Sequence, residues 1–184
     1  MNKAAFLDRD GVINVDKGYV FRETDLEWMP GAIEGMRKLQ DMGYQLIVVT
    51  NQSGIARGYY TEDDFHRLSQ FMIESLAHAG VTVAGIYFCP HHPNGSVERY
   101  TRICDCRKPA AGLILRAVKA LNIDPAQSLM VGDKASDMQA ARTAGITLLY
   151  HLTQASLFPG AVEVSSILDV AQKQRLGQNV RAQN

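Results

Sequence analysis

The stretch AAFLDRDGVIN, residues 4–14, places a short apolar run directly before two aspartates. A run that is apolar at every position is typical of a strand buried on both faces of a sheet. Similar runs recur along the chain at Gln45–Thr50, Val83–Phe88, Ser128–Gly132 and Thr147–Tyr150. The sequence therefore predicts five strands, of which the first is Ala4–Leu7.

Longer segments with apolar residues at helical spacing lie between these runs. Residues 31–42, for example, carry Ile33, Met36 and Leu39 at intervals of three, and Gly43 suits the end of a helix. The other predicted helices are Thr61–Gly80, Gly112–Asn122, Ser136–Ala144 and Ser165–Leu176. Strands that alternate with helices predict an α/β fold, a three-layer, doubly wound parallel sheet.

The size and charge of the chain limit its organisation and its partners. A chain of 184 residues can bury a core without disulfides or metals, which favours a single domain over residues 1–184. Lys plus Arg and Asp plus Glu both number 19, so we expect no nucleic-acid partner. We expect a monomer, because no sustained heptad marks an interface, and a mobile polar tail over residues 177–184.

The apolar segments are short. None reaches the roughly 18 residues expected of a membrane-spanning helix. The first apolar run is also too short for the core of a signal peptide. We therefore expect no membrane partner and a cytoplasmic location.

Polar residues follow three of the predicted strands, as Asp8–Gly11, Thr50–Gly54 and Gly132–Lys134, with Asp137 four positions after Asp133. Each short motif alone is more often a solvated turn than a site. The carboxyl ends of parallel strands, however, meet at one edge of the sheet, where ligands bind. Carboxylates gathered there repel one another, and a hard cation such as Mg²⁺ is the usual way to hold them ionised.

The motifs DRDGVIN, TNQS, RKP and GDKxxD, in this order, resemble the four motifs of the haloacid dehalogenase-like phosphatases. The resemblance runs from Phe6 to about Leu149 and implies the parallel α/β fold of that family. A large cap domain is not expected, because 30 residues separate Asn14 from Gln45, enough for a loop and one helix.

The resemblance implies that phosphate is transferred to an aspartate. Asp8 would be the nucleophile, and Asp10 would act first as the acid and then as the base. Thr50 and Lys108 would position the phosphoryl group and neutralise its charge. The catalytic Mg²⁺ would be held by the Asp8 carboxylate, the Asp10 backbone carbonyl and Asp133. Asp137 would stand behind these ligands and orient Lys108 or a metal-bound water.

All three cysteines lie in the segment CPHHPNGSVERYTRICDCRKP, residues 89–109. An odd number of cysteines so close together indicates metal ligands or reduced thiols rather than disulfides. Cys89 and His91, like Cys104 and Cys106, are separated by one residue, and three Cys with one His form a standard structural zinc site. His92 competes with His91 as the fourth ligand, and we prefer His91 because its spacing matches the second pair.

Three thiolates and one imidazole saturate Zn²⁺, so no position stays open for a catalytic water. We therefore expect a structural zinc that pins a loop over residues 89–106. Such a loop would place Arg107 and Lys108, which directly follow the last ligand, at the active site.

A longer set of motifs resembles the zinc-bearing heptose bisphosphate phosphatases within the same superfamily. This set is DRDG, TNQSGIARG, CPHHPxG, CDCRKP and GDKxxD. The resemblance implies that the partner is a small-molecule sugar bisphosphate, which loses its 7-phosphate in the synthesis of activated heptose for bacterial surface polysaccharide. The substrate contacts implied are Asp16, Lys17, Gly18, Tyr19, Thr50, Asn51, Gln52, Ser53, Arg107, Lys108 and Lys134. Members often carry His at the position of Lys17, so the sequence leaves the preferred anomer open.

Two other functions stay open. Histidinol-phosphate phosphatases share the aspartate motifs and the zinc loop, and their substrate also carries its phosphate on a primary carbon. The chain could instead be a non-catalytic, zinc-stabilised module that has kept a phosphate site. The presence of both Asp8 and Asp10 argues against this second alternative.

Overall fold

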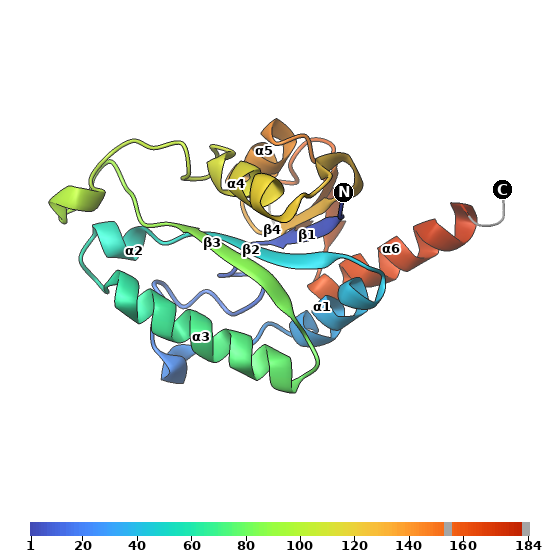
Figure 1. Cartoon of the computed structure of the whole chain (residues 1–184), viewed down its shortest axis with the longest axis horizontal. Coiled ribbons are helices and arrows are strands. Elements are labelled where there is room, and N and C mark those ends of the chain that lie inside the picture. The colour runs from blue at the N-terminus through green and yellow to red at the C-terminus, as the bar shows by residue number, and fades with distance from the viewer. Residues whose placement is uncertain (153–155, 182–184) are drawn as a thin grey trace.

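A computed structural model of the chain describes residues 1–152 and 156–181. The described residues form a parallel sheet of six strands in the order β3-β2-β1-β4-β5-β6, with helices on both faces (Figure 1). The strands are β1 Ala4–Leu7, β2 Gln45–Asn51, β3 Val83–Cys89, β4 Leu129–Gly132, β5 Leu148–Leu152 and β6 Val162–Val164. The predicted doubly wound α/β class is therefore confirmed.

Six α-helices connect or flank these strands in the described ranges. They are α1 Ala32–Asp41, α2 Ser53–Ala56, α3 Glu62–His78, α4 Gly112–Leu121, α5 Ala135–Thr143 and α6 Ile167–Arg181. Three short 3-10 helices lie in the loops, η1 Glu23–Asp25, η2 Glu98–Tyr100 and η3 Pro125–Gln127. Between β1 and β2 the chain forms only η1 and α1, so no large cap is inserted there, as expected.

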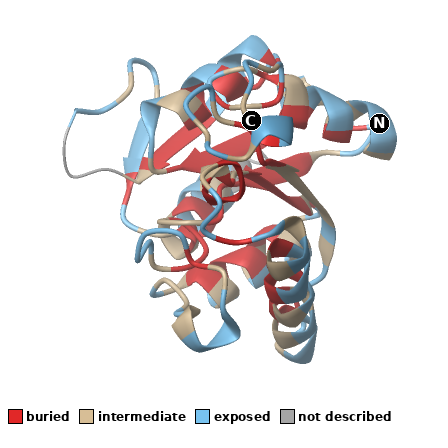
Figure 2. Cartoon of the chain, turned by 90° about the vertical axis from the view of Figure 1, so that its left-hand side faces the viewer, coloured by how far each residue is buried: buried red, intermediate tan, exposed pale blue. Residues whose placement is uncertain are grey.

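Successive residues of the central strand point to opposite faces of the sheet and so enter two different cores. Ala5 and Leu7 pack with residues of α1, α3 and α6 on one face. Ala4 and Phe6 pack with residues of α4 and α5 on the other face. Figure 2 shows the burial concentrated on the strands and on the inner sides of the helices. Burial on both faces explains why the sequence of β1 is apolar throughout.

Local signals define several helix ends. The Thr61 hydroxyl accepts a hydrogen bond from the Asp64 backbone N–H at 3.1 Å, and the Asp64 carboxylate accepts one from the Thr61 N–H at 2.8 Å. This capping box satisfies two backbone groups at the start of α3. Gly43, two residues after the end of α1, adopts a φ of +83°, a conformation that glycine reaches without strain.

The end of the chain differs from the sequence prediction in two ways. The strand β6 was not predicted, because three residues with two exposed positions make too short and too polar a signal. The helix expected to end at Leu176 continues to Arg181, so residues 177–181 of the expected mobile tail are helical. Residues 182–184 lie outside the described residues.

None of the helices within the described ranges is both long and apolar enough to cross a membrane.

The start of α4 packs directly against the turn that carries two of the cysteines. The Gly112 N–H donates to the Asp105 carbonyl at 3.0 Å. A Cβ atom on Gly112 would lie 2.4 Å from the Asp105 carbonyl oxygen, closer than any real contact. Only glycine therefore lets the helix and the turn approach so closely.

We expect Gly112→Ala to destabilise the protein by about 1–3 kcal/mol, because the added methyl group must push α4 away from the Asp105 backbone. Urea unfolding followed by circular dichroism measures this change. The matched control is Gly177→Ala in α6, where a Cβ atom meets nothing within 4 Å. This control should be neutral or stabilising by up to about 1 kcal/mol. Equal stabilities of the two variants would contradict the packing argument.

Candidate active site

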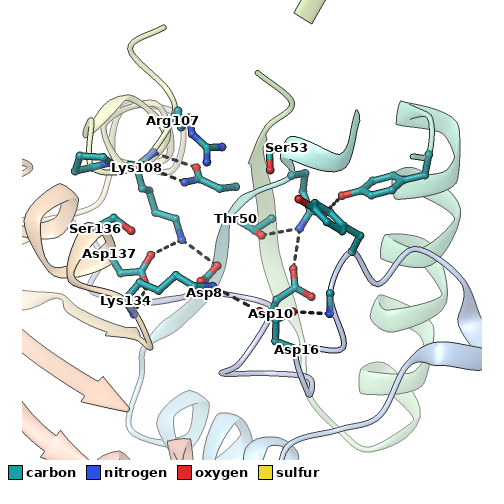
Figure 3. Close-up of a pocket in the computed structure, with 16 residues that line it drawn as sticks. Asp8, Asp10, Asp16, Thr50, Ser53, Arg107, Lys108, Lys134, Ser136 and Asp137 are labelled. Carbon is teal, nitrogen blue, oxygen red and sulfur yellow. Dashed lines mark hydrogen bonds and ion pairs between the residues drawn. The ribbon is translucent and has the colours of Figure 1, made fainter. Parts of the chain in front are cut away.

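A pocket of about 490 Å³ opens at the carboxyl ends of the strands (Figure 3). Its lining residues are Asp8, Asp10, Asp16, Gly18, Tyr19, Thr50, Asn51, Gln52, Ser53, Tyr60, Arg107, Lys108, Pro109, Lys134, Ser136 and Asp137. Most of the residues that the sequence predicted for the site are thus brought together from four distant segments. Lys17 is not among the lining residues, and its ammonium pairs with Glu27 at 2.8 Å on the protein surface.

Lys108 occupies the centre of the pocket floor, where its side chain is almost fully buried. Its ammonium lies 2.9 Å from the Asp8 carboxylate and 2.6 Å from that of Asp137, and it donates to the Val49 carbonyl at 2.8 Å. These contacts join the ends of β1 and β2 to the start of α5. The dashed lines in Figure 3 show both ion pairs.

The Lys108 backbone is held by the amide of Asn51 at the end of β2. The Asn51 Nδ2 donates to the Lys108 carbonyl, and the Lys108 N–H donates to the Asn51 Oδ1, both at 3.0 Å. The Asn51 side chain thus completes a two-bond pairing with the segment that follows the cysteines. This pairing fixes where the lysine enters the pocket.

Burial and neighbouring charges shift the acid–base equilibria of this centre. Burial raises the pKa of Asp8 to about 7, against the opposing effect of Lys108, and the nearby carboxylates Asp137 and Asp133 add to the rise. Burial alone would lower the pKa of Lys108, but Asp8 and Asp137 more than offset it and raise this pKa above its ordinary value. The lysine therefore stays positively charged at neutral pH.

Three carboxylates gather beside the lysine in an arrangement that suits a cation. One oxygen each from Asp8, Asp133 and Asp137 lie within 4.8 Å of one another. The Asp133 Oδ1 atom is buried and has no hydrogen-bond partner among the described residues. An oxygen donor set with an unsatisfied buried oxygen fits a hard divalent ion such as Mg²⁺.

Gly11 allows the metal-site acids to approach one another. Its φ is +86°, and a Cβ atom on it would lie 2.6 Å from the Asp133 carboxylate. A larger residue would therefore displace Asp133 from β1. This is the physical reason for the glycine that follows Asp10 in the sequence.

Asp137 serves two contacts at once. One of its carboxylate oxygens pairs with Lys108, and the other accepts the Lys134 backbone N–H at 3.0 Å at the start of α5. The Lys134 ammonium lies 3.6 Å from the Asp16 carboxylate and 3.5 Å from the Asp133 carboxylate, so it bridges these two acids. These positions join the metal-site acids to the loop that begins at Asp16.

Asp10 and Thr50 are linked through the buried amide of Gln52. The Gln52 Nε2 donates to the Asp10 carboxylate at 3.0 Å and to the Thr50 hydroxyl at 2.8 Å. The Gln52 Oε1 accepts the Tyr60 hydroxyl at 2.5 Å. Tyr60 and Ser136 also line the pocket and were not predicted as site residues. Tyr60 follows no strand end, so no sequence signal marked it.

The second cluster lies on the segment that leads to Lys108. The Sγ atom of Cys106 lies 3.2 Å from that of Cys89 and 3.3 Å from that of Cys104. The Nδ1 atom of His91 lies 3.3 Å from the Cys106 Sγ, and all four donor atoms fall within 4.8 Å of one another. One imidazole and three thiol groups so close together form a donor set that suits tetrahedral zinc.

The structure distinguishes between the two neighbouring histidines. His92 turns away from the cysteines, accepts the Asn94 backbone N–H at 3.0 Å through Nδ1, and faces Arg57 through Nε2. Burial, together with the Arg102 guanidinium, lowers the pKa of His91. Its imidazole is therefore neutral at pH 7, which is the form that binds metals.

Arg107 connects the cysteine cluster to the pocket. It directly follows Cys106, and its guanidinium donates to the His91 carbonyl at 3.3 Å. The side chains of Arg107 and Lys108 then both line the pocket. The cluster thus determines where these two cations lie.

The sequence matches a family of known proteins. The model of the haloacid dehalogenase-like hydrolase family matches residues 3–145, and the chain belongs to this family. Among individual proteins, it is 56% identical over 143 residues to D-glycero-beta-D-manno-heptose-1,7-bisphosphate 7-phosphatase of Escherichia coli strain K12, covering 78% of this chain and 75% of that protein. The protein of the same name from Haemophilus influenzae is 52% identical over 148 residues, 80% of each chain.

Solved structures agree with these matches. The crystal structure of D,D-heptose 1,7-bisphosphate phosphatase from B. bronchiseptica, complexed with magnesium and phosphate, superposes with a TM-score of 0.82 at 28% identity. The match covers 95% of this chain and 99% of that chain. The corresponding enzyme from Burkholderia thailandensis gives a TM-score of 0.67 at 25% identity, over 94% and 98% of the two chains. The chain is accordingly a phosphoric monoester hydrolase.

We expect Asp8→Asn to raise the melting temperature in the presence of a chelator, and more so at pH 8 than at pH 5. The folded-state pKa of Asp8, about 7, lies above the unfolded value of 3.8, so the folded protein keeps a proton that the unfolded chain releases. Stability is therefore lost as pH rises between these values. Asparagine removes that loss, and thermal melts at the two pH values measure it. A shift of the same size at both pH values would contradict the assignment.

Proposed function

We propose that the chain is a Mg²⁺-dependent phosphatase that removes the 7-phosphate from D-glycero-D-manno-heptose 1,7-bisphosphate. This reaction would supply the precursor of nucleotide-activated heptose for surface polysaccharide. The observation that carries the proposal is the pocket in which Asp8 meets Lys108, with Asp10 on the adjoining wall. Relatives more than half identical to the chain carry the name of this activity, which supports the choice of substrate.

The proposed reaction has two steps. First, the Asp8 carboxylate attacks phosphorus and forms an aspartyl phosphate, while Asp10 gives a proton to the departing sugar oxygen. Then Asp10 takes a proton from a water molecule that attacks the same phosphorus, and inorganic phosphate leaves. The Lys108 ammonium neutralises the charge of the phosphoryl oxygens. The Thr50 hydroxyl and backbone N–H groups of the segment from Thr50 to Ser53 orient these oxygens.

Mg²⁺ would be held by the Asp8 carboxylate, the Asp10 carbonyl and Asp133, and would neutralise charge on the phosphoryl group. Asp137 supports this centre by pairing with Lys108 rather than by contacting the substrate.

The sugar and its second phosphate would occupy the outer part of the pocket. Arg107 and Lys134 supply cations there. Asp16, Gly18 and Tyr19 line the pocket from the loop that follows β1. A guanidinium can bind a phosphate through two parallel hydrogen bonds, which suits Arg107 for the second phosphate. Lys17 would join these contacts only after leaving Glu27. We propose that residues 1–184 form one catalytic unit that acts as a monomer.

We further propose that Cys89, His91, Cys104 and Cys106 hold a structural Zn²⁺. The compact, largely buried donor set supports this assignment. Because the four ligands leave no open position, the ion would hold the loop and would not activate water.

Phosphate release from a panel of sugar phosphates tests the proposed function. The panel contains both anomers of the heptose bisphosphate, heptose 7-phosphate and histidinol phosphate, each with Mg²⁺ or with a chelator. We expect the fastest turnover on a heptose 1,7-bisphosphate, and only with Mg²⁺. Faster turnover of histidinol phosphate would replace the proposed substrate, and no turnover of any member would indicate a non-catalytic module.

The variant Asp8→Asn tests the nucleophile in the same assay. An amide oxygen is a poor nucleophile, so we expect turnover to fall by at least about 10⁴-fold while circular dichroism stays unchanged. Mass spectrometry of the wild-type protein, quenched during turnover, should detect the added phosphoryl group. Turnover within about tenfold of wild type would remove Asp8 from this role.

Elemental analysis tests the zinc site. We expect about one zinc per chain in the purified wild-type protein. Cys104→Ser should lower this occupancy, because the hydroxyl replaces a thiolate ligand, and should make the loop of residues 89–106 sensitive to proteases. The matched control His92→Ala, at a residue outside the cluster, should keep full occupancy. A zinc-free protein with a protease-resistant loop would contradict the assignment.

A further inference from the structure

The guanidinium of Arg9 is buried directly behind the carboxylate of Asp10. The Arg9 side chain is about 2% exposed, whereas that of Asp10 is 17% exposed and lines the pocket. The Arg9 Nη2 lies 2.9 and 3.0 Å from the two Asp10 oxygens, and its Nε lies 3.2 Å from both. A planar fork that contacts both oxygens fixes the plane and the direction of the carboxylate.

Two side-chain amides also donate hydrogen bonds to the Asp10 carboxylate. Asn14 donates to one carboxylate oxygen at 3.0 Å, and Gln52 donates to the other, also at 3.0 Å. Because the Tyr60 hydroxyl donates to the Gln52 Oε1, the Gln52 amide is held with its Nε2 toward Asp10. The carboxylate of Asp10 is thus gripped by Arg9, Asn14 and Gln52, a set that we name the Asp10 clamp.

Arg9 also connects Asp10 to the substrate loop. The Nη2 atom that contacts the carboxylate donates to the Val20 carbonyl at 2.8 Å. Val20 directly follows Gly18 and Tyr19, which line the mouth of the pocket. One guanidinium therefore fixes the distance between Asp10 and the wall that faces the substrate.

We propose that Arg9 is a positioning residue that aims Asp10 at the departing sugar oxygen. The inference rests on the proposed function, in which Asp10 gives that oxygen its proton. It differs from a purely structural role for Arg9, because a buried guanidinium needed only for stability has no reason to pair with the acid that lines the pocket.

The replacement Arg9→Lys keeps the charge but loses the fork, since an ammonium is a single compact donor group. It can reach one oxygen of Asp10 without holding the plane of the carboxylate or the Val20 carbonyl. The acid would then be misdirected, and proton transfer to the leaving oxygen would suffer while the attack of Asp8 would not.

A comparison of two leaving groups separates this effect from general damage. An alkoxide such as the heptose oxygen needs a proton to leave, whereas 2,4-dinitrophenolate leaves without one. We expect Arg9→Lys to lower kcat/KM for the heptose bisphosphate by about 10²-fold, and for 2,4-dinitrophenyl phosphate by less than about fivefold. The quantity kcat/KM is used because it covers the steps only up to departure of the leaving group.

A double-mutant cycle tests whether Arg9 acts through Asp10. The Asp10→Asn variant has no carboxyl group that Arg9 could orient. Adding Arg9→Lys to it should therefore cause little further loss of kcat/KM for the heptose bisphosphate. Arg37→Lys, at an exposed position of α1, is the matched control and should leave both substrates unaffected. Equal losses on the two substrates, or an undiminished effect in the Asp10→Asn background, would overturn the inference.

The variant Asn14→Leu decides the question if Arg9→Lys does not fold. It removes the Asn14 donor to the Asp10 carboxylate at a residue that does not line the pocket, and we expect the same selective loss on the heptose substrate. Equal losses on both substrates in this variant would show that the clamp does not aim the acid. A wild-type protein that hydrolyses neither substrate would overturn the proposed function itself, a result distinct from those of the variants.

Discussion

The buried ammonium of Lys108 is the group on which the arrangement of the pocket depends. A lysine in a protein interior must satisfy all three of its N–H donors, and here they meet Asp8, Asp137 and the Val49 carbonyl. These partners belong to the ends of two strands and the start of a helix. The pairing therefore fixes the relative positions of three elements, and it balances part of the repulsion among the acids around it.

Two kinds of donor cluster lie on the two sides of this lysine. The sulfur and imidazole donors of residues 89–106 suit zinc, and the carboxylates around Asp133 suit magnesium. Arg107 and Lys108 directly follow Cys106 along the chain, so the turn at Cys106 sets where both cations enter the pocket. A structural ion can in this way contribute to catalysis without contacting the substrate.

The central strands were predictable because they are buried on both faces and so are apolar at successive positions, as in Ala4–Leu7. The same reasoning missed β6, where Val162 and Glu163 are exposed at the edge of the sheet. It also ended the last helix too early, because the residues after Leu176 are mostly polar and were expected to form a mobile tail. A glycine ends a helix only when it leaves the helical conformation, and Gly177 lies inside α6.

The sequence by itself determined which residues follow the strand ends, and hence which acids, hydroxyls and lysines gather at one edge of the sheet. It also determined the spacing of the cysteines and the membership of the family. Only the tertiary structure decided that His91 rather than His92 joins the cysteines, that Lys108 pairs with Asp8 and Asp137, and that Arg9 faces Asp10. The physical reason is that a strand fixes the edge at which a side chain emerges, whereas its partners come from segments far away in the chain.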